Sequence, residues 1–302
     1  MASVVATGLS AGRHPFRTGW AWLCLLPTIV LLLVFAYWPL LQTLMLSTQQ
    51  TDLFGRPAGF AGLDNYAEMF ANPSFRRTLL TTLLFVVLTV AGKVIVSLAL
   101  AVPLARRIRG TGFARAAVLL PMAASAAVAG LAFRAMMTPS TGVLDQISIA
   151  LTGSSAGWIT EPTMALISIV IVDIWTAIGF VTLLFIAAID AVPEETLEAA
   201  SIDGASAWRA LLSIILPLIS PTLFFVLVTQ SMQAMREFTV INVVTGGGPG
   251  GATRTLTFDI WAAAFGGTAD YSAAAARGVV LLLLIGVMTA IQFGVLERKV
   301  TY

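Results

Sequence analysis

The sequence has few charged residues, one cysteine and one histidine. Charged side chains make up 11% of its 302 residues and hydrophobic ones 58%, whereas charged residues are near a quarter of an ordinary soluble domain. Because Cys24 is the only cysteine, an intramolecular disulfide and a cysteine-rich metal site are excluded. Because His14 is the only histidine, no histidine-based catalytic or metal cluster forms within one chain. The composition is that of a protein built for lipid.

The sequence also lacks a phosphate-binding loop and a large net charge. No stretch matches G-x-x-x-x-G-K-[ST], so the chain has no P-loop to hold ATP. The glycine cluster at 246–251 contains Pro249 and no following lysine. We interpret it as an ordinary loop or as a contact for a solute-binding protein. The formal net charge of +2 is too small to indicate a nucleic-acid partner.

Long apolar runs dominate what is present. A helix needs about 20 mainly apolar residues to cross the hydrocarbon layer of a membrane. The first run is too long for a cleavable signal peptide and is followed by no small-residue cleavage site, so we expect it to be retained. No internal repeat or long polar stretch interrupts the chain, which predicts one helical membrane domain over 1–302. Six spans are expected, at 20–46, 78–104, 116–137, 162–189, 210–235 and 278–296.

The distribution of Lys and Arg predicts the orientation of these spans. Short cytoplasmic connections of membrane proteins carry an excess of Lys and Arg. The third connection, 138–161, has neither. Basic residues gather in the second connection and in both tails, so we expect both termini in the cytoplasm, together with the fourth connection, 190–209. These basic residues are Arg106, Arg107, Arg109 and Arg115, then Arg13, Arg17, Arg298 and Lys299.

The fourth connection predicts a short, stiff helix followed by a turn. Pro193 suits the first turn of a helix, where its missing N–H has no partner, and Glu194 complements the positive end of the helix dipole. Gly204 can adopt the left-handed conformation that ends such a helix. An Ala-rich segment of this kind is also compatible with an ordinary amphipathic helix at the membrane surface.

The same connection resembles a known family. Glu198-Ala199-Ala200, Asp203-Gly204-Ala205 and Ile214-x-Leu216-Pro217 are similar to the EAA motif in permeases of binding-protein-dependent ABC importers. The resemblance implies an all-α integral membrane fold of the type I importer, with six transmembrane helices and a cytoplasmic coupling helix in the loop 190–217. It implies that Glu198, Ala199, Ala200, Asp203 and Gly204 couple the permease to a separate ATPase.

The resemblance covers nearly the whole chain and points to carbohydrate-type importers. Its carrying segments are Gly62–Tyr66, Leu119–Pro121, Thr245–Pro249 with Thr253, Thr255 and Leu256, and the ending Glu297–Tyr302. The ending and Asp52–Gly55 are similar to permeases that take up glycerol 3-phosphate or glycerophosphodiesters such as glycerophosphocholine. A permease for a di- or oligosaccharide is the alternative within the family.

The family implies several partners and no catalytic activity of this chain. The expected partners are a second, homologous permease chain, two copies of a cytoplasmic ATPase that bind ATP and Mg, and an extracytoplasmic solute-binding protein, all at a bacterial inner membrane. No cofactor or metal is expected in this chain. An ion-coupled secondary transporter would instead predict inverted repeats and broken helices. An intramembrane enzyme would need more than the one carboxylate that the spans contain.

Three charged side chains fall within the expected spans. A charge near the bilayer centre costs several kcal/mol unless it is paired or faces water, so each is a candidate pathway residue. Lys93 and Asp173 lie at depths that permit an ion pair, which would fix helix packing, but both are also candidates for contact with the solute. Arg134 lies near an outer helix end, where it can reach the headgroup region.

Polar residues also lie on the fifth expected span and just after it. Gln230, Gln233 and Glu237 have the spacing of one helical face, and Arg236 is adjacent. Gln230, Gln233 and Arg236 are therefore expected to hydrogen-bond a polyol or a phosphate group in the pathway. Hydrogen bonds between helices are the alternative use of glutamine in a membrane.

Overall fold

The computed structural model describes residues 18–52, 57–105, 111–267 and 269–296. Internal contacts divide the chain into two compact units, Met1–Met45 and Leu46–Tyr302, and each is described by itself. The basic tails, Arg106, Arg107 and Arg109, and the ending Glu297–Tyr302 lie outside the described residues, as do three of the four residues from Asp52 to Gly55.

The first unit is a long apolar helix. Helix α1, Thr18–Leu32, continues through a π-helical turn, Leu33–Tyr37, into α2, Trp38–Leu46. Residues Trp22–Leu46 form a candidate span of 25 residues with no buried position. Length and composition therefore agree with the first expected span, and its apolar surface is free to face lipid or another chain.

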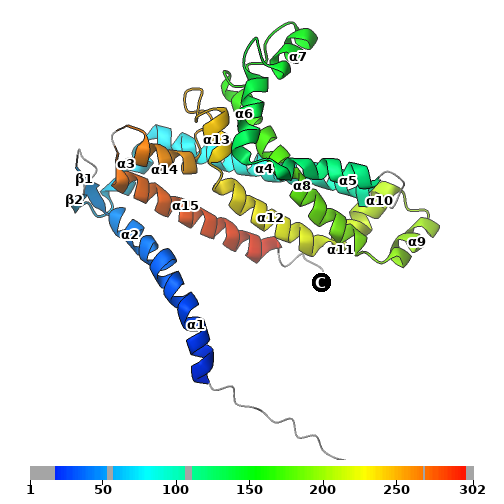
Figure 1. Ribbon diagram of the computed structural model, residues 1–302, viewed down its shortest axis with the longest axis horizontal. Coiled ribbons are helices and arrows are strands. Elements are labelled where there is room, and N and C mark those ends of the chain that lie inside the picture. The colour runs from blue at the N-terminus through cyan, green and yellow to red at the C-terminus, as the bar shows by residue number, and fades with distance from the viewer. Residues whose placement is uncertain (1–17, 53–56, 106–110, 268, 297–302) are drawn as a thin grey trace, which may run out of the picture. The chain divides into compact units, whose positions relative to one another are not determined.

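Three further spans are single long helices. They are α4, Pro73–Ala105, α8, Pro162–Asp190, and α15, Tyr271–Ile291, which ends in a π-helical turn, Gln292–Leu296. In Figure 1 these helices run along the same general direction of the second unit. They coincide with the spans expected at 78–104, 162–189 and 278–296.

The third expected span is divided. Helix α5, Thr111–Leu119, passes through a 3₁₀ turn, Leu120–Ala123, and meets α6, Ala126–Met137, at 97°. Both Ala124 and Ser125 have extended backbone conformations, and the Ser125 hydroxyl then caps α6 by accepting the N–H of Val128. The residues on both sides are apolar, so the length of the run gave no indication of this break.

The fifth expected span is also bent. Helices α10, Ala207–Ala210, and α11, Leu216–Leu218, are joined by a π-helical turn, and α12, Ser220–Met235, follows at 74°. Pro221 cannot donate to the carbonyl of Pro217, and its ring crowds that carbonyl, which bends the chain here. The described residues therefore contain four continuous candidate spans, or six if each bent pair counts as one.

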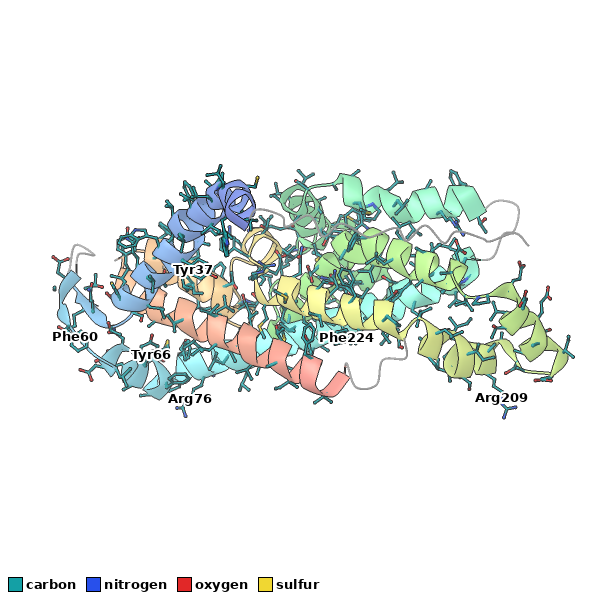
Figure 2. The ribbon with its side chains drawn as sticks, turned by 90° about the horizontal axis from the view of Figure 1, so that it is seen from below. Tyr37, Phe60, Tyr66, Arg76, Arg209 and Phe224 are labelled. Atoms are coloured by element: carbon teal, nitrogen blue, oxygen red, sulfur yellow. The ribbon has the colours of Figure 1, made fainter. Side chains whose placement is uncertain are left out.

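Short elements lie at the two ends of the second unit. At one end the strands β1, Gln49–Thr51, and β2, Pro57–Phe60, form an antiparallel hairpin next to α3, Asp64–Ala71. At the other end lies α9, Glu194–Ile202. Figure 2 places Arg76, at the start of α4, and Arg209, in α10, toward these opposite ends. The remaining short helices are α7, Val143–Thr152, α13, Thr239–Val244, and α14, Leu256–Phe265.

The core is built on the parallel pair α4 and α8. Phe85 of α4 and Ile169 of α8 belong to one buried cluster, and Ala101 and Val181, further along the same helices, belong to a second. Residue numbers rise together on both helices, so the two run in the same direction. At Gly179 of α8 an added Cβ would lie 2.9 Å from the carbonyl oxygen of Val118, so the approach of α5 requires a glycine.

Candidate functional site

Helix α9 has a defined beginning and a defined end. It begins at Glu194, with Pro193 preceding it as the N-cap residue rather than within the first turn as expected. At its end Gly204 has φ +74°, its N–H donates to the carbonyl of Ser201, and the N–H of Ala205 donates to the carbonyl of Ala200. These two bonds form a Schellman motif, which satisfies carbonyls that the helix end leaves free. The segment is therefore a rigid helix and turn.

The expected coupling residues lie mainly on the exposed surface of α9. Glu198, Ala199 and Asp203 are exposed, whereas Ala200 faces the protein with 8% of its surface exposed. Two apolar side chains that sequence reasoning did not single out are also exposed here, Ile202 at 86% and Trp208 at 68%. Their apolar character was visible in the sequence, but their exposure was not. This surface is suited to bury itself against a partner protein.

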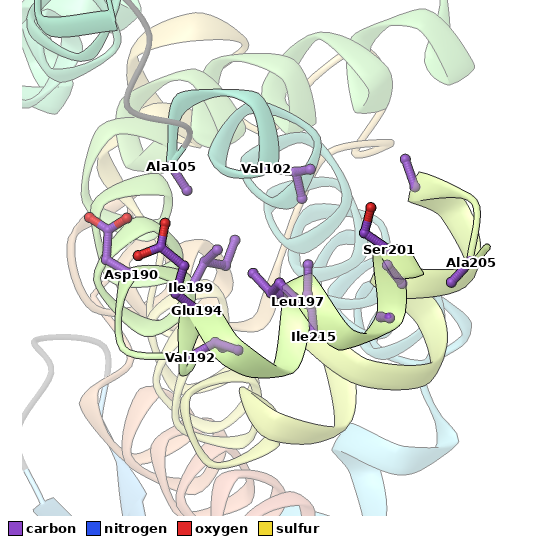
Figure 3. Close-up of a pocket in the computed structure, with 13 residues that line it drawn as sticks. Val102, Ala105, Ile189, Asp190, Val192, Glu194, Leu197, Ser201, Ala205 and Ile215 are labelled. Carbon is purple, nitrogen blue, oxygen red and sulfur yellow. The ribbon is translucent and has the colours of Figure 1, made fainter. Parts of the chain in front are cut away.

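A cavity of about 710 Å³ separates α9 from the bundle. Figure 3 shows it between α9 and the ends of α4 and α8, with the carboxylates of Asp190 and Glu194 on one side. Most of the residues that line it have apolar side chains, and polar groups contribute about half of its surface. Leu197 packs onto the buried cluster at the ends of α4 and α8, so α9 touches the bundle through few side chains. The lining residues are Val102, Ala105, Ile189, Asp190, Val192, Glu194, Leu197, Ala200, Ser201, Ala205, Ala207, Ala210 and Ile215.

Arg115 of α5 joins the ends of the two central helices. Its Nε and Nη2 atoms donate to the carbonyl oxygen of Leu104 in α4, at 3.0 and 2.8 Å. The Nη2 atom also lies 3.6 Å from the carboxylate of Asp190 at the end of α8. A cation at a helix C-terminus complements the helix dipole. One side chain therefore holds α4 and α8 together next to α9.

Lys93 and Asp173 pair deep within the second unit. The Lys93 ammonium lies 2.8 Å from the Asp173 carboxylate, although the geometry is not that of a hydrogen bond, and the two side chains are 1% and 5% exposed. The structure brings together two expected pathway residues and closes them off from solvent between α4 and α8. The ion pair neutralises both charges in a region where a lone charge would be costly.

The expected polar face of α12 is split. Gln230 is buried, and its Oε1 atom has no hydrogen-bond partner among the described residues, whereas Gln233 and Arg236 are exposed. The Arg236 Nε atom donates to the carbonyl of Met232. Glu237 lies beyond the end of α12 and accepts the N–H of Val240 at the start of α13, so it does not share the helical face. The spacing therefore predicted neither the different exposure of Gln230 and Gln233 within α12 nor the end of the helix before Glu237.

Arg134 is exposed and has a specific hydrogen-bond partner. Its Nη1 atom donates to the carbonyl oxygen of Val243 at 3.0 Å, which ties α6 to the end of α13. The glycine-rich loop that follows α13 is ordered by hydroxyl groups. Thr253 is fully buried, lies 2.7 Å from the Thr245 hydroxyl, and donates to the carbonyl of Gly248. The loop between α13 and α14 is therefore held in a defined conformation by side-chain hydrogen bonds.

The third connection is organised around Asp145. Its carboxylate accepts the backbone N–H of Ser140 at 2.8 Å and the hydroxyl of Ser155 at 2.6 Å. The Ser155 hydroxyl, followed by the Ser140 N–H, holds the pKa of Asp145 below its ordinary value. This carboxylate fixes the loops on both sides of α7, and sequence reasoning did not predict it.

Comparison with known proteins gives a family and near relatives. A family model described as "Binding-protein-dependent transport system inner membrane component" matches residues 143–302. The sn-glycerol-3-phosphate transport system permease protein UgpA of Agrobacterium fabrum is 35% identical over 284 residues, covering 93% of this chain and 96% of the relative. The proteins of that name from Yersinia pestis and Escherichia coli are 36% and 34% identical, each covering 97% of this chain and 100% of the relative.

The fold also matches solved structures. A bacterial ABC transporter that imports the acidic polysaccharide alginate has a chain that superposes with a TM-score of 0.80, at 23% identity, covering 93% of this chain and 96% of that one. The same type of transporter in complex with an alginate pentasaccharide-bound periplasmic protein gives a TM-score of 0.77 at 22% identity, covering 93% and 95%. At this identity the likeness establishes the fold alone.

Proposed function

The chain belongs to the family of binding-protein-dependent transport system inner membrane components, and we propose that it forms half of the import pathway for sn-glycerol 3-phosphate or glycerophosphodiesters. It is a multi-pass permease subunit of an ABC importer. The observation that carries the substrate proposal is the 33–36% identity, over nearly the full length of both chains, to permeases of sn-glycerol-3-phosphate transport.

Helix α9 transmits the movement of a separate ATPase. The support is its rigid Schellman end and the exposure of Glu198, Ala199, Asp203 and Ile202, followed by the exposed Trp208 in α10. In this proposal Ala200 packs against the protein, Gly204 ends the helix, and the exposed residues contact the ATPase. Two ATPase copies bind ATP and Mg, one for each permease chain.

The solute passes along the exposed face of α12. Gln233 and Arg236 are polar and exposed on a membrane helix, where contact with lipid would be costly, so they suit a water-filled pathway. Their amide and guanidinium groups can bind hydroxyl and phosphate oxygens. Gln230 and the Lys93–Asp173 pair are buried and suit a role in holding the helices together.

A second permease, related in sequence, completes the pathway, and a solute-binding protein delivers the solute from outside. The exposed polar face of α12 requires a neighbour of matching character, and the exposed apolar residues of Trp22–Leu46 can face lipid or the second permease. A transporter of the same fold has been solved with a periplasmic protein bound. Both termini and α9 face the cytoplasm, in keeping with Arg115 and Arg209 at that end of the second unit.

Reconstitution of the complete importer tests the substrate. The two permeases, the ATPase and the binding protein would be placed in lipid nanodiscs, and ATP hydrolysis measured with glycerol 3-phosphate, glycerophosphocholine or a disaccharide. Stimulation by the glycerophosphates is expected. Stimulation by the disaccharide alone would refute the glycerophosphate assignment and favour a sugar permease of the same family.

A further inference from the structure

Two arginines share one buried carboxylate at the start of α14. The Arg254 Nε atom bonds to Oδ1 of Asp259, and the Arg277 Nε atom, from α15, bonds to Oδ2 at 2.7 Å. The Asp259 side chain is 6% exposed, whereas those of Arg254 and Arg277 are 36% and 20% exposed. The carboxylate is therefore enclosed, and both guanidinium groups reach the surface.

Two arginines pair with one aspartate in this cluster, so its net charge is positive. One arginine is sufficient to neutralise Asp259 and to tie α14 to α15, so the second leaves a net charge of +1. Each guanidinium uses Nε, and within the described residues neither makes a further hydrogen bond or ion pair. The Nη groups are therefore held in position and can donate hydrogen bonds to an anion. The planar guanidinium group is well suited to bind carboxylate and phosphate oxygens.

The cluster is recessed below the end of the helices. The N–H of Leu256 donates to the hydroxyl of Thr82, and the Thr257 hydroxyl donates to the carbonyl of Met235 at the end of α12. Thr82 is nine residues after Pro73, the start of α4, which corresponds to about 14 Å along that helix. At this position Asp259 is enclosed while both guanidinium groups reach the surface, so their positive charge is placed where an anionic solute can meet it.

We propose that Arg254 and Arg277, held in place by Asp259, bind the phosphate group of the incoming solute at the outer mouth of the pathway. This inference rests on the proposed function and its orientation. Two guanidinium groups provide several donors to a phosphate, whereas a neutral sugar offers no charge to match them. The cluster thus selects for an anionic solute before the glycerol part reaches the amides of α12. Asp259 is a positioning residue because it orients both arginines without contact to the solute.

The test uses Arg254→Gln, because Arg277 still pairs with Asp259 in this variant and α14 stays anchored. Inorganic phosphate is the probe, with binding to the complete importer in nanodiscs measured by ³¹P NMR titration without binding protein. Affinity for phosphate is expected to fall about tenfold in Arg254→Gln, which loses one charge-assisted interaction. Arg254→Lys should retain most of the affinity. Arg76→Gln, an exposed arginine outside the cluster, is the matched control and should bind like the unaltered protein.

Import of glycerol 3-phosphate by the same variants separates this inference from the proposed function. Slower import by Arg254→Gln, with unchanged basal ATP hydrolysis and an unchanged melting temperature, supports the phosphate role. If Arg254→Gln binds phosphate and imports glycerol 3-phosphate normally, the inference is overturned and the proposed function stands. If the unaltered importer does not transport glycerophosphates, the substrate proposal fails, and loss of phosphate binding in Arg254→Gln still supports an anion site.

Discussion

The ammonium of Lys93 and the carboxylate of Asp173 lie 2.8 Å apart, enclosed between α4 and α8. Removing one partner leaves the other charge buried and unpaired, which costs about 3–5 kcal/mol. Lys93→Met and Asp173→Leu are therefore each expected to destabilise the permease strongly, with loss of protein from the membrane. The measurement is thermal unfolding of the purified importer in detergent.

The double variant distinguishes packing from solute contact. Lys93→Met with Asp173→Leu leaves no charge unpaired, and its stability should return close to that of the unaltered protein. Import should return as well if the pair only fixes the two helices. A stable double variant that does not transport would show that these groups act on the solute. A double variant as unstable as either single one would contradict the pairing.

Gly204 is expected to be required for coupling. Its φ of +74° disfavours any side chain, although an added Cβ would meet no atom within 4 Å, so Gly204→Val costs about 1–2 kcal/mol locally and distorts the end of α9. Solute-stimulated ATP hydrolysis should be lost. The control is Gly153→Val at the end of α7, where φ is +80° and space is equally open. Equal effects of both variants on coupling would count against the role of α9.

The exposed surface of α9 gives a second prediction for coupling. Glu198→Arg reverses an exposed charge on α9, and Trp208→Ala removes a large exposed apolar side chain from the following helix α10. Both should weaken co-purification of the ATPase, whereas Glu195→Gln, at the helix start, should not. Retention of the ATPase at normal levels by both Glu198→Arg and Trp208→Ala would rule out this docking surface.

The third connection should lose order in acid. Because the pKa of Asp145 is lowered in the folded protein, its contribution to stability is complete above the ordinary value near 3.9. That contribution is lost as the pH falls through the lowered value. Amide exchange across 138–161 should therefore rise below about pH 4. In Ser155→Ala, which removes the main stabilising bond, the rise should begin at higher pH. Identical profiles for the two proteins would contradict the assignment.

Membrane orientation can be measured with single cysteines in a Cys24→Ser background. Ser154, in the third connection, and Ser201, on α9, are exposed in the structure. A membrane-impermeant maleimide should label Ser154→Cys in cells with a permeabilised outer membrane, and Ser201→Cys only after lysis. The reverse pattern would place α9 outside and would remove the basis for its contact with an ATPase.

Much of the helical framework could be predicted from the sequence, because an apolar run of sufficient length has few alternatives to a span. The bend at Ser125 was not predicted, because apolar residues lie on both sides of it; the bend at Ile219 had a signal in Pro221, which the length of the apolar run concealed. Helices α13 and α14 were missed since they are too short to cross a membrane. Gly204 was predicted correctly because its role is local, and the left-handed turn depends only on neighbouring residues.

The candidate site was less predictable where it depends on tertiary contacts. The spacing of Gln230, Gln233 and Glu237 suggested one face, but α12 ends at Met235 and the face ends with it. The hydrogen bond from Arg134 to the carbonyl of Val243 could not be predicted, because that carbonyl comes from another helix. The pairing of Asp259 with Arg254 and Arg277 could not be predicted from the sequence, because it is the packing of α14 against α15 that brings Arg277 to Asp259.

The parallel pair α4 and α8 has a mechanical consequence. The Lys93–Asp173 pair joins the helices at mid-length, and Arg115 joins them at the end where Leu197 of α9 rests. Because these two contacts connect α4 and α8, we expect the two helices to move together as one rigid body. Helix α8 has 29 residues and is about 44 Å long, so a tilt of about 10° applied at one end displaces the other by about 8 Å. A stroke of that size is comparable to the width of a glycerophosphate.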